Sequence, residues 1–514
     1  ADVDVTAPLN TSGTLRGRLV GVVDHRDSHV DTLFNNKQAA YGTLELDIRP
    51  DTTLSVGYMQ QRIHASVDQG FPSFADGRLP DVPRSTLAGL RANRQDLDSQ
   101  DTFVELEHRM DGGGQLKFSA RDVLRSSFYR SARANSAIAA DGTLQLQTVD
   151  FLQELKDRNY DVYVTQPITW GGLTHRVLLG ASYNTSDAYN GNYVYGSTPT
   201  FNLYRPDYDL PYPTLTLPGY QNITTRSEKA LYGQAQLSAT RWLKFLVGGR
   251  VSWAKVATEQ LTGATAVPSY NPGRHVTPSA SVIADINSQL SAYLSRSETF
   301  VVQSALTSSG QVLPPRTGSQ IELGLKGEFF NKRLQTHTAL FRILDKDRAI
   351  ADPAMSTASI PGGEVRSQGF EAEASGRVAQ GWDITAGYAY TDTTYLKAPT
   401  SQVGQVFSTV TPQHSVNLST KYRIKALGLQ AWTVGGGVSY RSEFFAQNGA
   451  LRIVSGDYAL FNAQLSYRIN DQLSLNLTAD NLFDKTYYDK VSGSPRQNFY
   501  GEPRRVALTL QARY

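Results

Sequence analysis

The clearest sign of the fold lies in residues 473–480, which read Leu473-Ser474-Leu475-Asn476-Leu477-Thr478-Ala479-Asp480. Apolar and polar side chains alternate without interruption, which is the period of a β-strand with one apolar and one polar face. Residues 461–468 and 321–328 alternate in the same way, and the polar face of 321–328 carries charges. The chain is therefore predicted to consist of amphipathic strands.

The length of these segments separates a membrane protein from a soluble one. Many run for about ten residues or more, whereas strands of soluble proteins are typically about 5–6 residues long. A strand that crosses a membrane needs about 9–11 residues, and it turns its apolar face toward lipid. The side chains expected to face lipid are Phe461, Leu465, Leu473, Leu475 and Leu477. Those expected to face the lumen are Gln464, Ser466, Ser474 and Asn476.

The connections between the segments alternate between short and long. Short connections with turn residues lie at 8–13, 49–52, 111–114, 170–172, 330–332, 379–381 and 470–471. Long connections lie near 65–99, 129–142, 187–226, 257–273, 301–315, 347–361, 394–407, 443–454 and 486–498. This sorting is typical of outer-membrane barrels, with short periplasmic turns and long extracellular loops. The predicted fold is an all-β, antiparallel transmembrane barrel in the lipid of a Gram-negative outer membrane.

Composition excludes several other classes of protein. The 514 residues include no cysteine, so disulfides, thiolate nucleophiles and zinc–thiolate sites are ruled out. No apolar stretch reaches the ~20 residues of a transmembrane helix. The formal net charge of +3 leaves no broad basic face, so nucleic acid is not an expected partner.

The number of strands is predicted to be about 21, ending with a strand at 499–513. Because single-chain bacterial barrels have an even number of strands, we expect one more strand upstream of Ala1. Residues 1–7 already alternate and have neither an initiating Met nor a signal sequence, which fits a chain that begins within its protein. The last strand alternates up to Tyr514, an expected anchor at one membrane interface.

Four stretches together resemble the TonB-dependent outer-membrane receptors, in particular their ferric-siderophore branch. They are Asn481-Leu482-Phe483-Asp484-Lys485-Thr486-Tyr487-Tyr488 with Tyr500-Gly501-Glu502-Pro503-Arg504, Gly318-Ser319-Gln320-Ile321-Glu322-Leu323, Ser367-Gln368-Gly369-Phe370-Glu371-Ala372, and Thr14-Leu15-Arg16-Gly17-Arg18-Leu19-Val20. The matches span nearly the whole chain in the expected order. The resemblance implies a barrel of the 22-stranded type whose lumen is plugged. Nothing in residues 1–514 resembles the N-terminal plug or the TonB-contacting box, so we interpret the whole chain as barrel.

No catalytic or metal-binding constellation stands out. The eight histidines form no compact ligand motif, and His25 and His29 are more simply two loop histidines at a barrel mouth. The chain is therefore not expected to be an enzyme, although a hydrolase with its site at the barrel rim is kept as a third alternative. No resident cofactor is expected, because the resemblance implies that iron arrives already chelated.

Aromatic residues in the long connections are the candidate ligand contacts. Residues 187–226 hold eight tyrosines and phenylalanines, and tyrosine combines a flat apolar face with a hydroxyl at low entropic cost. The candidates are Phe71, Phe74, Tyr193, Tyr195, Tyr204, Phe300, Gln303, Phe444 and Phe445. The alternative is that these side chains pack the loops together or line the membrane interface. Ser304-Ala305-Leu306 stands where some relatives carry a Trp-Tyr pair, so no particular siderophore is transferred to this chain.

The predicted function is uptake of a ferric siderophore, energised through TonB in the full-length protein, by a monomeric receptor. The alternative is a passive porin-like channel, which would usually have about 16–18 strands and no plug. A plug-like segment in the upstream coding sequence would favour the transporter.

Overall fold

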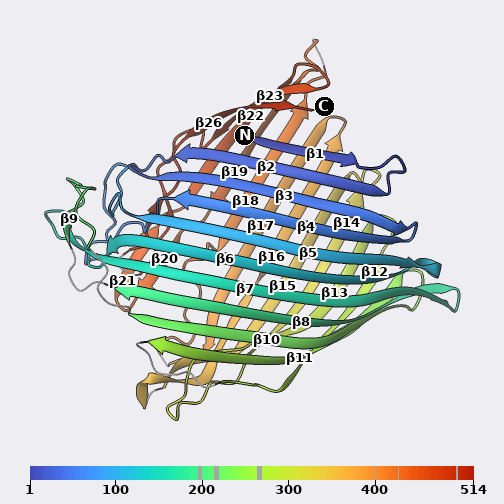
Figure 1. Ribbon diagram of the computed structural model, residues 1–514, viewed down its shortest axis with the longest axis horizontal. Coiled ribbons are helices and arrows are strands. Elements are labelled where there is room, and N and C mark those ends of the chain that lie inside the picture. The colour runs from blue at the N-terminus through green and yellow to red at the C-terminus, as the bar shows by residue number, and fades with distance from the viewer. Residues whose placement is uncertain are drawn as a thin grey trace.

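The computed structural model describes residues 1–194, 199–213, 219–262, 269–352, 354–399, 401–425, 428–493 and 496–513. Almost all of the regular structure is β-strand (Figure 1). The first half of the chain forms β1 (Asp2–Pro8), β2 (Leu15–Asp27), β3 (Phe34–Arg49), β4 (Thr52–Ala65), β5 (Arg94–Met110), the 3-10 turn Asp111–Gly113, β6 (Gly114–Ala134), β7 (Thr143–Trp170), β8 (Leu173–Val194), β9 (Thr200–Asn202), β10 (Tyr220–Ser238), β11 (Leu243–Thr262) and β12 (Arg274–Asp285). The second half forms β13 (Leu290–Val301), β14 (Arg316–Phe329), β15 (Leu334–Asp352), β16 (Met355–Ala379), β17 (Trp382–Lys397), β18 (His414–Arg423), β19 (Trp432–Arg441), β20 (Phe444–Asn448), β21 (Leu451–Ser455), β22 (Tyr458–Arg468), β23 (Leu473–Asp480), β24 (Tyr488–Lys490), β25 (Phe499–Tyr500) and β26 (Arg505–Ala512).

One antiparallel meander contains nearly all of these strands. The hairpins β20–β21 and β24–β25 form two small separate sheets, and within the described residues β9 pairs only with the start of β7. Each remaining strand pairs with the next along the chain, so 21 strands of the described chain follow one another around the wall and β9 is the 22nd member of the sheet. The predicted all-β barrel architecture with about 21 strands is confirmed. Within the described residues, no helix is long and apolar enough to cross a bilayer.

Aromatic side chains mark two levels on the outer face of the wall. Trp170 and Trp382 are exposed at the end with the short turns, and Tyr160, Tyr183 and Trp253 are exposed nearer the long loops. Trp170 and Tyr160 lie ten residues apart on β7, or about 33 Å along the strand. At a tilt of about 35–45° this spans about 25 Å of height, which matches the apolar band of an outer-membrane barrel between its two aromatic girdles.

The expected lipid and lumen faces of the last strands agree with their pairing. Leu477 lies opposite Leu465 and Leu508, and all three side chains are exposed on the outer face. Asn476 lies opposite Ser466 and therefore points to the other face of the same strands.

The strands extend further from the membrane than the sequence predicted. The predicted connections 129–142, 187–226 and 347–361 are wrong in their bounds, because β6 continues to Ala134, β8 to Val194 and β16 begins at Met355. Beyond the bilayer both faces of a strand meet water or other loops. Pairing therefore continues there without the apolar alternation that identifies a strand inside the membrane.

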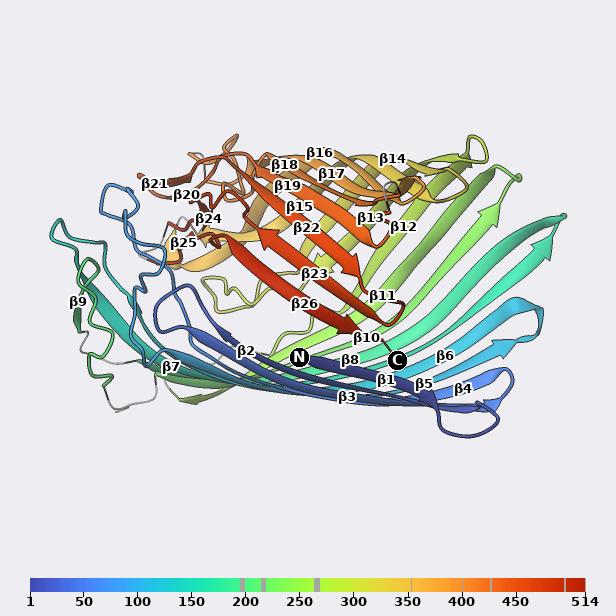
Figure 2. The ribbon, with the colours of Figure 1, turned by 90° about the horizontal axis from the view of Figure 1, so that it is seen from above.

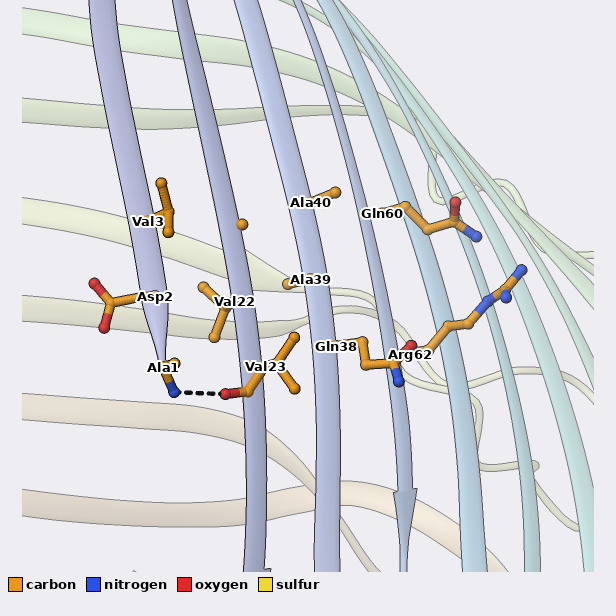
Figure 3. A pocket seen from close by; sticks show the side chains of 11 residues that line it. Ala1, Asp2, Val3, Val22, Val23, Gln38, Ala39, Ala40, Gln60 and Arg62 are labelled. Carbon is orange, nitrogen blue, oxygen red and sulfur yellow. Dashed lines mark hydrogen bonds between the residues drawn. The ribbon is translucent and has the colours of Figure 1, made fainter.

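The wall has one seam. Among the described residues β1 pairs only with β2, and β26 pairs only with β23. Figure 2 shows β1 and β26 pointing the same way at the two margins of the sheet, as an odd number of antiparallel strands requires. A shallow apolar depression lies beside the β1 margin, with Ala1, Val3 and Ala40 in its wall and Arg62 at its side (Figure 3).

Candidate functional site: the extracellular mouth

Three segments that are distant in the sequence pack together at the end with the long loops. The segments are 66–93, 199–213 and the described part of 481–504, which is 481–493 and 496–504. Phe71 and Leu90 from the first share an apolar cluster with Phe201 and Leu203 from the second, over the ends of β6 and β7. Tyr500 from the third packs against the same cluster. These three segments therefore form one packed structure, called here the loop roof.

A clasp of polar contacts joins the first segment of the loop roof to the third. The Arg84 guanidinium donates to both carboxylate oxygens of Asp484 at 2.9 Å. The hydroxyls of Tyr488 and Tyr500 both donate to the Pro80 carbonyl at 2.9 Å. The backbone N–H of Arg504, followed by Arg84, holds the pKa of Asp484 below its ordinary value. Residue 84 precedes β5 and residue 484 precedes β26, so the clasp bridges the two sides of the seam.

Two of the predicted ligand contacts are core residues of the loops. Phe71 is only 4% exposed inside the cluster of the loop roof. Phe444 is 5% exposed and packs against Ile453, Tyr458 and Val491 in a second apolar cluster. This burial favours the alternative that the side chains of Phe71 and Phe444 pack the loops together.

Other predicted contacts keep accessible surface. Tyr204 is 48% exposed in the loop roof. Phe74 and Phe445 are partly buried beneath arginine guanidinium groups, with Arg452 only 3.9 Å from the centre of the Phe445 ring. Phe300 is partly buried and stacks on His275 with 4.2 Å between ring centres. Phe74 packs against the apolar cluster of the loop roof.

The remaining predicted contacts serve the scaffold or lie outside the described residues. The Gln303 amide donates to the carbonyls of Pro314 and Asp347 and accepts from the backbone N–H of Ala349, which ties two loops together. Tyr193 lies on β8 in phase with the outward-facing Tyr183, and its hydroxyl accepts a bond from Gln221. Tyr195 lies outside the described residues.

Sequence reasoning missed a row of carboxamides on the inner wall. Gln153 on β7, Asn190 on β8, Asn222 on β10 and Gln260 on β11 are direct cross-strand neighbours. Gln153 Nε2 donates to Asn190 Oδ1 at 3.0 Å, and Asn190 Nδ2 donates to Asn222 Oδ1 at 3.3 Å. Each of these residues occupies a lumen-facing position of its strand, which the sequence alternation could have shown. That the four lie side by side follows only from the register of the four strands.

Several charges of the lumen wall below this row are paired with one another. Arg16 donates to both carboxylate oxygens of Asp47, and Lys117 Nζ lies 2.9 Å from Glu105. Arg250 and Glu228 form a further pair at 2.6 Å. Because charges removed from bulk water require partners, these pairs make a polar wall that is stable against either water or a protein surface. Among the described residues, no group of three or more His, Asp or Glu side chains is placed to hold a metal ion.

Fold and site together define an outer-membrane β-barrel receptor with a structured extracellular mouth. Residues 38–482 match the family described as TonB dependent receptor-like, beta-barrel, and the chain belongs to this family of transport proteins, which are not enzymes. The chain is 32% identical to the ferric-pyoverdine M114 receptor of Pseudomonas sp. strain M114, over 99% of this chain and 64% of that protein. It is 29% identical to the ferripyoverdine receptor of Pseudomonas aeruginosa, again over 99% and 64%. The chain thus spans about 64% of the length of these curated relatives.

Solved structures agree with this assignment. The crystal structure of the Pseudomonas aeruginosa outer-membrane ferripyoverdine receptor bound to ferripyoverdine matches with a TM-score of 0.91 at 28% identity. The match covers 99% of this chain and 69% of that chain. A complex of a related receptor with pyocin S2 matches equally well, with a TM-score of 0.91 at 27% identity over 99% of this chain and 70% of that one.

Proposed function

We propose that this barrel belongs to a receptor that takes up a ferric siderophore and is energised through TonB in the full-length protein. The observation that carries the proposal is the match, over 99% of the chain, to ferric-pyoverdine receptors. Relatives named for ferrioxamine B and for metal-pseudopaline match less closely. The relatives are thus all named for metal chelates, but for different ones, so we do not assign a particular chelate to this chain.

The loop roof and the lumen wall have different roles in this proposal. The loop roof holds three extracellular segments together at the mouth, and its accessible aromatic faces, with Tyr204 the most exposed, provide apolar contact for the edges of a chelate. Iron stays with its chelator, so the barrel supplies shape and hydrogen bonds in place of metal ligands. The polar lumen wall, in which several charges are paired, provides a surface along which a chelate or a plug can move.

Closure of the barrel is part of the same proposal. Because β1 and β26 run in the same direction, they cannot pair as antiparallel neighbours. One strand placed between them, antiparallel to both, completes a ring of 22 strands, an even number like those of other single-chain bacterial barrels. The clasp between Arg84 and Asp484 already holds the two sides together at the extracellular end.

The competing function is a passive channel. The experiment measures the single-channel conductance of the full-length receptor in planar lipid bilayers. A plugged transporter predicts that the full-length protein stays closed. Stable open currents from the full-length protein would favour the porin.

A companion experiment identifies the chelate class. Purified full-length receptor is titrated with ferripyoverdine, ferrioxamine B and ferric citrate, and tryptophan fluorescence quenching reports binding. The proposal predicts saturable binding of at least one of the three. Binding of none would remove the siderophore assignment.

A further inference from the structure

The four carboxamides of the inner wall form an unusually regular feature of the mouth. Gln153, Asn190, Asn222 and Gln260 stand side by side across four consecutive strands of the wall, and two amide–amide hydrogen bonds link the first three of them. We propose that this carboxamide row is the subsite that binds an uncharged, amide-bearing part of the ferric chelate. The proposal rests on the siderophore function proposed above.

The row lies on the inner face and well outside the membrane. Tyr160, Tyr183 and Trp253 mark the outer girdle on β7, β8 and β11, and each lies seven residues from the amide of its own strand. An odd separation places the amides on the opposite face of the wall. Seven residues correspond to about 23 Å along the strand, so the row stands above the bilayer, where a chelate arriving from outside first meets the wall.

The hydrogen-bonding capacity of the row exceeds what the wall uses. A carboxamide offers two N–H donors and an oxygen with two lone pairs, yet the bonds within the row engage one donor each of Gln153 and Asn190. Within the described residues, Gln260 Oε1 is enclosed and meets no donor, and the same holds for Asn192 Oδ1 two residues further along β8. Enclosed polar atoms without partners cost free energy, so these oxygens favour a conformation in which a donor reaches them.

The chemistry of the row selects the kind of ligand. It contains no ionisable group, and the next inward residues toward the membrane on β10 and β11 are Thr224 and Thr258, whose hydroxyl oxygens lie 3.2 Å apart. Amides and hydroxyls that both donate and accept are matched by secondary amides, which present one N–H and one C=O. A carboxylate-rich chelate without N–H groups can only accept, so it leaves both enclosed oxygens unpaired.

The test replaces the inner amides and keeps an outer amide as control. In the full-length receptor, Asn190→Leu combined with Asn222→Leu removes the middle of the row at nearly constant volume. Gln221→Leu removes the same chemistry one residue away on the outer face, where Gln221 donates to Tyr193. Asn190→Ser is a milder variant, and heat-modifiable gel mobility verifies that each protein is folded.

Binding of ferripyoverdine and ferrioxamine B, which carry amides, is compared with binding of ferric citrate, which carries none. We expect the wild type to bind an amide-bearing chelate more tightly than ferric citrate. The double variant should bind the amide-bearing chelate at least tenfold more weakly than the wild type, and Asn190→Ser should lose less affinity. Gln221→Leu should change the affinity less than twofold. Unchanged binding by the double variant, an equal loss in Gln221→Leu, or a wild-type preference for ferric citrate would overturn the subsite while leaving the siderophore function in place. Failure of the wild type to bind any of the three would instead overturn the proposed function, and the subsite with it.

Discussion

Leu477→Arg tests whether the apolar face of the strands meets lipid. Leu477 is 41% exposed and lies between Leu465 and Leu508 on neighbouring strands. On β22, Leu465 lies two residues further from the periplasmic turn than Tyr467, so Leu477, opposite Leu465, lies deeper in the apolar band than Leu475. An arginine on the lipid face costs about 2–4 kcal/mol at the midplane of the bilayer and about 0–1 kcal/mol near the interfaces.

Leu475→Arg and Leu477→Arg place an arginine at two different depths of the bilayer on the same strand. Leu475 lies opposite Tyr467, beside the periplasmic girdle, so Leu475→Arg is expected to cost less than Leu477→Arg. Asn476→Arg is the matched control, because Asn476 faces the lumen opposite Ser466, where water solvates the guanidinium.

The assay is reversible urea unfolding of the full-length receptor from lipid vesicles, followed by tryptophan fluorescence. We expect a loss of about 2–4 kcal/mol in the free energy of unfolding for Leu477→Arg, an intermediate loss for Leu475→Arg, and little change for Asn476→Arg. Equal losses for Leu477→Arg and Asn476→Arg would show that the two faces of the strand are assigned wrongly.

Three further predictions concern the mouth. Arg84→Gln breaks the clasp to Asp484 and should speed chymotrypsin cleavage near Phe71 and Phe74, whereas Asp76→Asn, which removes an exposed pair with Arg78 in the same segment and leaves Arg78 over Phe74, should not. Because the folded pKa of Asp484 is lowered, its contribution to stability is present above the ordinary carboxyl value of 3.8 and is lost as pH falls through the lower folded value; sensitivity to pepsin, which cleaves in acid, should therefore rise only in strong acid, and Asp484→Asn should abolish that pH dependence. Deleting residues 190–220 should abolish growth on the cognate ferric siderophore while the barrel still reaches the outer membrane, and unchanged growth would separate this segment from recognition.

The membrane-spanning part of the fold could be predicted because lipid imposes a strict rule on it. Every second side chain must be apolar, so segments such as 473–480 reveal both strand and face. The same rule ends at the interface, which is why the extensions of β6, β8 and β16 were mistaken for loops. The predicted number of strands was still correct, because a longer strand does not change how many times the chain crosses the membrane.

The candidate site was harder to predict, since an aromatic side chain suits both ligand contact and loop packing. Phe71 and Phe444 became loop cores because segments distant in the sequence meet there, and no local pattern reports such meetings. Tyr193 entered the predicted site as a loop residue, but its strand register gives it an outward direction. The carboxamide row escaped notice for the same reason, because Gln153 and Gln260 are separated by two hairpins in sequence and joined only by register.

Transport of radioactive iron tests whether the full-length receptor takes up chelated iron with energy from TonB. Cells that carry the full-length receptor are given a ⁵⁵Fe-labelled siderophore that the purified receptor binds, and uptake is followed in the presence and absence of TonB. The account predicts uptake that accumulates against the external concentration and disappears without TonB. Uptake that proceeds at the same rate without TonB would contradict it and point to a passive channel.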